Sequence, residues 1–229
     1  KMKKLFIIIL LISGTLTYSQ NSFHLYHFNA KEGGQAAIAN LTDSYWGDAK
    51  FKSGGVSIER IRIGDNEWSH RIIFFGEVDN FGRVEGDVEK YEWGLFLQRL
   101  NDYVEEWGPS AAGRFSSYEG GSIKDFPFVQ LYTFRASNPS AFKKAHDKIV
   151  SQMKKTLDNR PVAFGNFDIG GEGATHWVAV GSKSLNDLMK IKVEMEKMEK
   201  EWDEYYKSRG GVDPKSNFVI QVLKTYGGI

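Results

Sequence analysis

The sequence repeats itself at a constant spacing of 106 residues. A repeat of this length indicates one folding unit used twice, which limits the fold more than any other feature of the chain. The matches are identical residue types in both copies: Leu25 and Leu131, Tyr26 and Tyr132, Phe28 and Phe134, Ala30 and Ala136, Val56 and Val162, Ile63 and Ile169, and His70 and His176. We therefore expect two similar units, at residues 22–121 and 126–227.

Both units show the same order of hydrophobic patterns. Strands alternate apolar and polar residues, whereas helices place apolar residues three and four positions apart. Strands are expected at 23–30, 56–63, 70–78, 111–118, 128–136, 162–169, 176–181 and 217–226, and helices at 35–46, 92–107, 139–157 and 185–207. The last helix has apolar residues at heptad spacing, which suits a face laid on the sheet or a contact with another subunit. Each unit therefore reads as a ferredoxin-like βαββαβ arrangement.

The second strand of each unit shares an irregularity. Val56 and Ile58 lie on one face of an alternating strand, but Ile61 lies on the other face. The same change of face occurs within 162–169. Because side chains alternate strictly along a regular strand, this change predicts one extra residue, a β-bulge near 59–60 and again near 165–166.

A four-stranded sheet with helices on one face needs a partner for its other face. The linker at 120–125 is short, so the sister unit is the obvious cover. We predict an α+β fold in which two tandem ferredoxin-like units pack as a pseudo-dimeric α/β barrel. This arrangement resembles the dimeric α/β-barrel superfamily, which includes monooxygenase-like, haem-degrading and chlorite dismutase-like proteins. The resemblance covers nearly all of 22–227 and rests on topology and repeat, so it implies a fold and assigns no catalytic residue.

The first residues have the pattern of a secretory signal peptide. Lysines at the start precede an apolar run at 5–12, and small residues lead to an expected cut after Ser19. The alternative is an uncleaved membrane anchor, but the run is shorter than the ~20 residues that span a bilayer. We expect a secreted or periplasmic protein that lacks stable membrane insertion once 1–19 are removed.

The composition excludes several classes of protein. The chain has no cysteine, which excludes disulfides, a thiolate nucleophile and cysteine-ligated metals. Its formal net charge is +1 and no strong basic patch occurs, so no nucleic-acid partner is expected. Phosphate-binding glycine loops, dinucleotide fingerprints and nucleophile elbows are also missing from the sequence, so it identifies no cofactor.

His70 and His176 are the candidate catalytic residues. They occupy equivalent positions at the start of the third strand of each unit, and each follows a hydroxyl residue. Histidine titrates near neutral pH, so a symmetric pair suits a general base or an anchor. No further ligand stands at metal-binding spacing, and no metal site is predicted. The alternative is a structural role, with each ring bonded to nearby backbone.

The first strand of each unit supplies the candidate substrate-binding residues. His27 and Asn29 share one face of their strand, and Thr133 and Arg135 share the matching face. The other face is aromatic in both units. A few polar groups amid apolar walls are typical of small-molecule pockets, and Arg135 suits a carboxylate or phenolate. The alternation leaves open which face lines a cavity.

Two functions follow from these features. The first is a secreted small-molecule-binding protein of dimeric α/β-barrel type, monooxygenase-like or lyase-like, with a small apolar or aromatic ligand. The alternative is a non-catalytic envelope or extracellular interaction module. The aromatic content of 14% favours it, because aromatic residues in excess of the core would form an exposed patch that binds a partner. Either form is compatible with a homo-oligomer.

Overall fold

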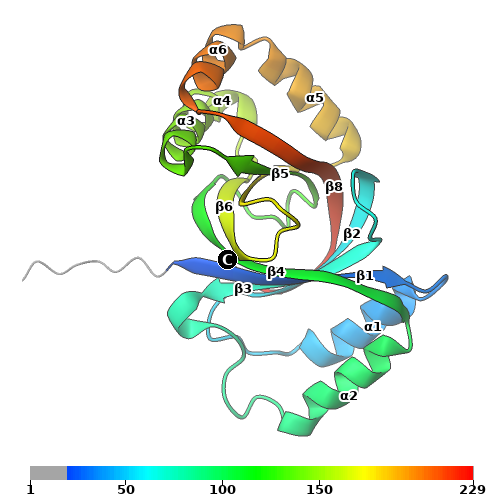
Figure 1. Ribbon diagram of the computed structural model, residues 1–229. Coiled ribbons are helices and arrows are strands. Elements are labelled where there is room, and N and C mark those ends of the chain that lie inside the picture. Colours follow the sequence, from blue (N-terminus) through cyan, green and yellow to red (C-terminus); the bar gives the residue numbers. More distant parts are fainter. Residues whose placement is uncertain (1–19, 229) are drawn as a thin grey trace, which may run out of the picture.

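Eight antiparallel strands form one closed barrel in the computed structural model, which describes residues 20–228 (Figure 1). The predicted signal peptide at 1–19 lies outside the described residues. The strands are β1 (Asn21–Ala30), β2 (Gly55–Gly64), β3 (His70–Glu77), β4 (Val104–Glu119), β5 (Phe128–Ala136), β6 (Val162–Ile169), β7 (His176–Ser182) and β8 (Val212–Gly227).

The order of the strands around the barrel is β1-β3-β2-β8-β5-β7-β6-β4. Each half of the barrel keeps the ferredoxin-like order, β4-β1-β3-β2 and β8-β5-β7-β6. The halves join where β2 pairs with β8 and β4 pairs with β6. Closure leaves no unpaired sheet edge among these strands, and the predicted α+β barrel is confirmed.

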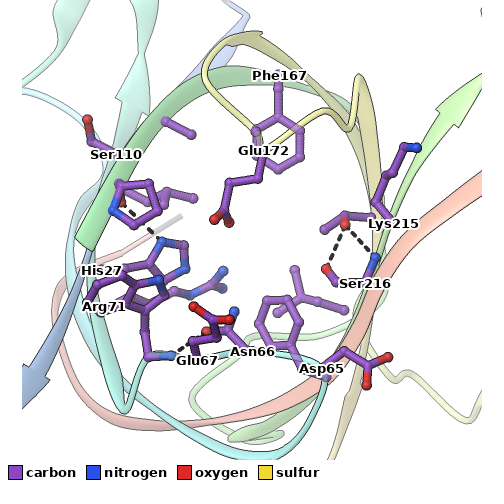
Figure 2. Close-up of a pocket in the computed structure, with 18 residues that line it drawn as sticks. His27, Asp65, Asn66, Glu67, Arg71, Ser110, Phe167, Glu172, Lys215 and Ser216 are labelled. Atoms are coloured by element: carbon purple, nitrogen blue, oxygen red, sulfur yellow. Dashed lines mark hydrogen bonds between the residues drawn. The ribbon is translucent and has the colours of Figure 1, made fainter.

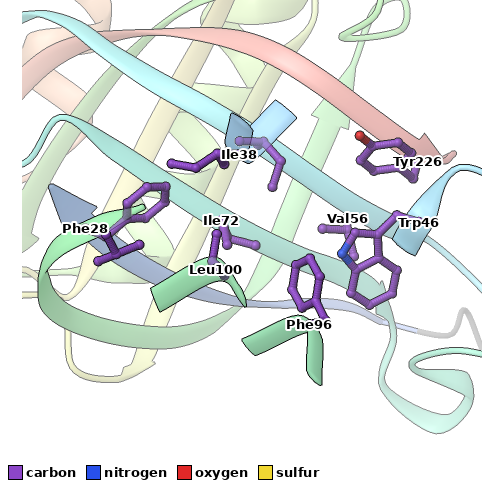
Figure 3. Close-up of a cluster of buried hydrophobic side chains, with 10 residues drawn as sticks. Phe28, Ile38, Trp46, Val56, Ile72, Phe96, Leu100 and Tyr226 are labelled. Atoms are coloured by element: carbon purple, nitrogen blue, oxygen red, sulfur yellow. The ribbon is translucent and has the colours of Figure 1, made fainter. Parts of the chain in front are cut away.

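The helices lie outside the barrel, on two opposite sides (Figure 1). The first side carries α1 (Gln35–Trp46) and α2 (Lys90–Asn101), and a short 3-10 turn, η1 (Val78–Asn80), follows β3. The second side carries α3 (Pro139–Gln152), α4 (Lys154–Leu157), α5 (Leu185–Glu196) and α6 (Glu199–Ser208). Figure 3 shows the core between α1, α2 and the outer face of the sheet, built on buried residues such as Phe28, Ile72 and Leu100.

Two helices begin directly after a residue whose side chain caps the helix N-terminus. Asn138 caps α3, because its side-chain oxygen accepts a hydrogen bond from the Ala141 amide at 3.0 Å, and Pro139 begins the first turn. Ser184 caps α5 in the same way through the Asp187 amide at 3.0 Å.

The expected helix at 92–107 is wrong in its second part. α2 ends at Asn101, and β4 begins at Val104 and runs for 16 residues. Pro109, which follows the end of that expected helix, lies inside β4. It is tolerated there because the pairing of β4 with β1 shifts between Tyr26 and Phe28, so no ladder hydrogen bond from residue 109 is required.

The two long helices expected in the second unit are each broken. The first divides at Met153, and the second divides at Lys197 and Met198. The break turns α6 back onto α3, where Trp202 and Tyr205 pack against the cluster around Met153. The apolar residues at heptad spacing are therefore used within the chain.

Equivalent bulges occur in β2 and β6, two residues beyond the predicted positions. Opposite β8, the extra residue is Arg62, between Ile61 and Ile63. Opposite β4, the extra residue is Asp168, which stands 106 positions after Arg62. The change of face in the sequence has another cause: Ile58 packs under the helices, whereas Ile61 packs inside the barrel.

Candidate functional site

A cavity of about 460 Å³ opens at one end of the barrel. Figure 2 looks into it and shows side chains from both halves of the chain around the opening. His27 and Arg71 come from the first half, and Thr133, Glu172 and Ser216 come from the second. An eight-stranded barrel is just wide enough to hold side chains or one small ligand, so this cavity is the first candidate for a binding site.

Three polar residues form a row across neighbouring strands inside the barrel. His27 of β1 stands opposite Arg71 of β3, and Arg71 stands opposite Glu59 of β2. Residues in directly opposite positions lie on the same face of a sheet, with Cβ atoms about 5 Å apart. All three are buried, with exposed fractions of 7%, 6% and 6%. The register of the strands therefore brings these groups together.

His27 presents an unprotonated nitrogen. Its Nδ1 lies 3.2 Å from the carbonyl oxygen of Pro109, and a carbonyl only accepts, so Nδ1 carries the proton. Nε2 is buried and has no hydrogen-bond partner within residues 20–228. Burial, reinforced by the charge of Arg71, lowers the pKa of His27 to about 4. The ring is therefore neutral at physiological pH, and Nε2 offers a lone pair.

Some of the hydrogen-bond donors of Arg71 are unused within residues 20–228. Its Nε donates to the Glu59 carboxylate in a buried ion pair. Within the described residues, its two terminal nitrogens make no further hydrogen bond, and the side chain lines the cavity. Burial raises the pKa of Glu59, although the neighbouring guanidinium opposes the change. The pair places a planar donor fork beside the free nitrogen of His27.

The rim of the cavity is rich in carboxylates. Asp65 and Glu67 come from the turn between β2 and β3, and Glu172 comes from the turn between β6 and β7. Figure 2 shows that the Glu172 carboxylate and the His27 ring both point into the opening. Among residues 20–228, Lys215 is the one lysine that lines this cavity. On the far wall, the hydroxyls of Thr133 and Ser216 share a hydrogen bond of 2.7 Å.

A second, smaller space of about 110 Å³ lies further inside the barrel. It shares four lining residues with the first cavity: Leu25, Arg71, Leu131 and Phe167. Its wall includes the rings of Phe23, Phe115, Phe167 and Trp177, and Phe23 contacts the other three edge to face. We call it the inner chamber. It extends the polar cavity into an apolar space.

The structure separates the four predicted substrate-binding residues. His27 and Thr133 line the barrel cavity. Asn29 does not; its side-chain oxygen accepts a hydrogen bond from the Ser69 amide at 2.9 Å. Arg135 is exposed and donates to the Gly173 carbonyl. The residues near the middle of this polar face, His27 and Thr133, thus point into the barrel. Asn29 and Arg135, near the ends of the strands, make hydrogen bonds to the backbone of neighbouring turns.

The predicted catalytic histidines lie on the other side of the sheet. His70 is 1% exposed and stacks on Phe28 at 5.4 Å, with Nδ1 2.8 Å from the Ser69 hydroxyl. His176 stacks on Phe164 at 5.6 Å, and its Nδ1 lies 2.7 Å from the Thr175 hydroxyl. Burial lowers the pKa of both rings, to about 4 for His70. Neither residue lines the barrel cavity.

Three residues of the cavity region, Glu59, Arg71 and Glu172, were not predicted from the sequence. Charge within a strand did not single out the first two, because β2 also holds Arg60 and Arg62 and β3 also holds Glu77. Glu59 shares a face of β2 with Ser57, and Arg71 shares a face of β3 with Ile73, and both faces line the barrel interior. Glu172 stands in a turn, where a charged residue is common and indicates nothing by itself.

A third cavity, of about 1040 Å³, lies between α3, α5, α6 and the outer face of the second half of the sheet. It is mostly apolar, and one buried imidazole lines it. His146 of α3 has Nδ1 3.3 Å from Asp147, and Nε2 has no partner within the described residues. Burial lowers the pKa of His146, although Asp147 opposes the change.

Within residues 20–228, no cluster of three or more histidine and carboxylate side chains has the arrangement of a metal site. No helix in that part of the chain is long and apolar enough to cross a membrane.

No protein-family model matches this sequence, and no curated protein matches it. Several solved structures share the fold. A candidate monooxygenase from Fusobacterium nucleatum is 15% identical, with a TM-score of 0.59 over 93% of this chain and 97% of the other. A second candidate monooxygenase, from Lactobacillus acidophilus, is 12% identical, with a TM-score of 0.59 over 92% and 98%. A haem-binding protein from Thermus thermophilus is 11% identical, with a TM-score of 0.50 over 90% and 92%.

These likenesses extend over nearly the whole of both chains. The chain therefore has the dimeric α/β-barrel fold that its repeat predicted. At identities of 15% or less, the likeness is one of fold, so the function has to be argued from the site.

Proposed function

We propose that the chain is a monooxygenase-like or lyase-like enzyme that binds a small, weakly acidic organic molecule in the barrel cavity and removes its proton. The observation that carries the proposal is the free Nε2 of His27 beside the free donors of Arg71. A proton passes from the bound hydroxyl or activated C–H group to Nε2. The electron pair left on the substrate is delocalised onto its oxygen, which accepts hydrogen bonds from the Arg71 fork.

The charges of the site favour a substrate that enters uncharged. Asp65, Glu67 and Glu172 outnumber Lys215 at the rim, and the charge of Arg71 is already balanced by Glu59. An oxyanion formed inside the cavity still gains from the guanidinium, because that interaction is stronger away from water. A base with a pKa near 4 is weak, so Arg71 has to increase the acidity of the substrate for the transfer to proceed.

The test uses 4-nitrophenol, whose phenolate absorbs visible light. At a pH where the free phenol is protonated, binding to the native chain should produce the phenolate absorbance. His27→Gln should retain binding within a few-fold and lose that absorbance. Arg71→Lys keeps a positive charge beside Glu59 but loses the donor fork, and it should weaken binding about tenfold.

His24→Gln is the matched control, because His24 lies on the same strand, is exposed and stacks on Phe81 outside the cavity. Equal binding and equal absorbance in all four proteins would refute the proposal. Uptake of dioxygen with a phenolic substrate, measured with an oxygen electrode, would separate a monooxygenase from a lyase.

Haem binding at the third cavity is a second candidate function. The observation in its favour is the unpartnered Nε2 of His146, a nitrogen of the kind that ligates haem iron, in a mostly apolar space. Lys192 and Arg209 also line this space and suit the propionates. Titration with haemin should give a Soret band that His146→Ala abolishes and His24→Ala leaves unchanged. A band that survives His146→Ala would exclude this ligand.

We also propose export of the chain. The support is the basic start and the short apolar run in 1–19. N-terminal sequencing of the mature protein should begin at Gln20, and a mature chain that retains 1–19 would contradict the proposal.

A further inference from the structure

We infer that the substrate is an uncharged phenol or enol that carries a short apolar extension, and that this extension occupies the inner chamber. The inference rests on the proposed function, because it assigns the acidic hydroxyl to His27 and Arg71. Beyond that function, the inner chamber binds the apolar extension of the ligand, and the carboxylates of the rim repel a negatively charged ligand.

The inner chamber is continuous with the barrel cavity. Leu25, Arg71, Leu131 and Phe167 line both spaces, and Arg71 therefore stands at the boundary between them. A group held by the Arg71 donors has the polar cavity on one side and the apolar chamber on the other. A single ligand anchored at this boundary can reach both.

The chamber exists because small residues stand side by side in the second half of the barrel. Ala163 of β6 lies opposite Ala179 of β7, and Ala179 lies opposite Leu131 of β5. At the equivalent positions of the first half stand Ser57 and Ile73. Two adjacent methyl groups leave the space that an isoleucine would fill.

The size and lining of the chamber limit the extension. Its volume of about 110 Å³ is room for roughly three or four groups of water size, at about 30 Å³ each. Most of the wall consists of aromatic rings, among them Phe23, Phe115 and Phe167, and of aliphatic side chains, and the polar side chains of Ser57, Glu59 and Arg71 also line it. A propyl group or a similarly small branched group fits this space, whereas a second charged group does not.

The rim supplies the selection by charge. Glu67 and Glu172 face the opening through which a ligand enters, and Lys215 lies on the opposite wall from His27 (Figure 2). A carboxylate ligand of the same shape is repelled on entry, while an uncharged hydroxyl is not.

The experiment compares phenol, 4-propylphenol and 4-propylbenzoate by isothermal titration calorimetry. The native chain should bind 4-propylphenol at least tenfold more tightly than phenol, because three methylene groups leave water. It should also bind 4-propylphenol at least tenfold more tightly than 4-propylbenzoate. Glu67→Gln combined with Glu172→Gln should reduce the difference in affinity between 4-propylphenol and 4-propylbenzoate. The difference in affinity between 4-propylphenol and phenol should stay unchanged.

Variants of Ala179 test the chamber directly. Ala179→Val and Ala179→Leu should reduce the advantage of 4-propylphenol stepwise while phenol still binds with native affinity, and retained phenol binding shows that the variants are folded. Ala36→Leu, on the exposed side of α1, is the matched control and should change neither affinity.

Each failure identifies a different error. Equal affinities for phenol and 4-propylphenol, or an advantage that survives Ala179→Leu, would overturn the chamber assignment while phenol binding that depends on Arg71 keeps the proposed function. Tighter binding of 4-propylbenzoate than of 4-propylphenol would overturn the charge selection. Failure of all three probes to bind would remove the proposed function and this inference together.

Discussion

The two halves of the barrel share one frame and differ in one interior row. At three equivalent positions, 106 residues apart, the first half has ionisable side chains and the second half has none. The pairs are His27 and Thr133, Arg71 and Trp177, and Glu59 and Gly165. The pairing between strands is the same in both rows, since Trp177 stands opposite both Thr133 and Gly165. Backbone pairing thus fixes where a side chain points and leaves its chemistry free.

Each row is internally consistent. In the first half, the buried charge of Arg71 is matched by Glu59. In the second half, the bulky ring of Trp177 is matched by Gly165, at which a Cβ atom would collide with that ring. The residues of each row therefore depend on one another, because a change at one position alone would leave a buried charge or a steric clash.

The largest expected effect comes from breaking the charged row. Arg71→Met leaves the Glu59 carboxylate buried without its partner, and we expect a loss of about 3 kcal/mol in the free energy of unfolding. Urea denaturation at neutral pH measures it. Glu59→Leu combined with Arg71→Met removes both charges and should recover most of the loss. A single variant within about 1 kcal/mol of the native chain would show that the pair is not a stabilising unit.

The next effect comes from the uncharged row of the second half, Thr133, Trp177 and Gly165. Gly165→Ala places a methyl group against the Trp177 ring and the Arg114 carbonyl, and overpacking of this kind costs about 1–3 kcal/mol. Gly94→Ala is the matched control, because Gly94 lies in α2 with open space around it, and alanine favours a helix by about 1 kcal/mol. Thermal unfolding should therefore move in opposite directions for the two variants. A stabilising effect of Gly165→Ala would mean that the space beside the Trp177 ring can accept a methyl group.

The sequence predicted the frame much better than it predicted these rows. A spacing of 106 residues gave the strand order, both ferredoxin-like units and a shared bulge, since these depend on patterns that occur twice. The end of α2 was predicted wrongly, because Trp107 and Pro109 are as compatible with the last turn of a helix and its termination as with a bulged strand. Periodicity does not show where a helix gives way to a strand that is held by distant partners.

The site was predicted in part for the same reason. Alternation placed His27 and Thr133 on one face, and the structure shows that this face lines the cavity. It gave no means of finding Glu59 and Arg71, because their meeting depends on the register of three strands. Identity between the units directed attention to His70 and His176, whereas the polar row lies at positions where the units differ.

The histidine of the polar row should make stability depend on pH. His27 has a pKa of about 4 in the folded chain against a usual value of 6.5, so the unfolded chain binds more protons between these values and stability falls as the pH is lowered through them. We expect a loss of about 1 kcal/mol from His27 between pH 6.5 and 5.5.

His27→Thr, which installs the residue of the second half, is the variant that isolates this contribution. Urea titrations across the same interval should show a shallower slope for it, although His70 still contributes in the same direction. An identical slope in the variant and the native chain would show that His27 is not responsible.

The smallest effect concerns the two seams at which the halves join. At the β4–β6 seam, Arg114 donates to both carboxylate oxygens of Asp168, at 2.7 and 2.8 Å, whereas the equivalent bulge residue at the β2–β8 seam is Arg62. The two side chains are 44% and 39% exposed, so solvent screens their attraction. Asp168→Asn should cost less than about 1 kcal/mol in urea denaturation, and the difference should shrink in high salt. Because backbone pairing closes both seams, a loss above 2 kcal/mol would mean that closure of this barrel depends on the Arg114–Asp168 ion pair.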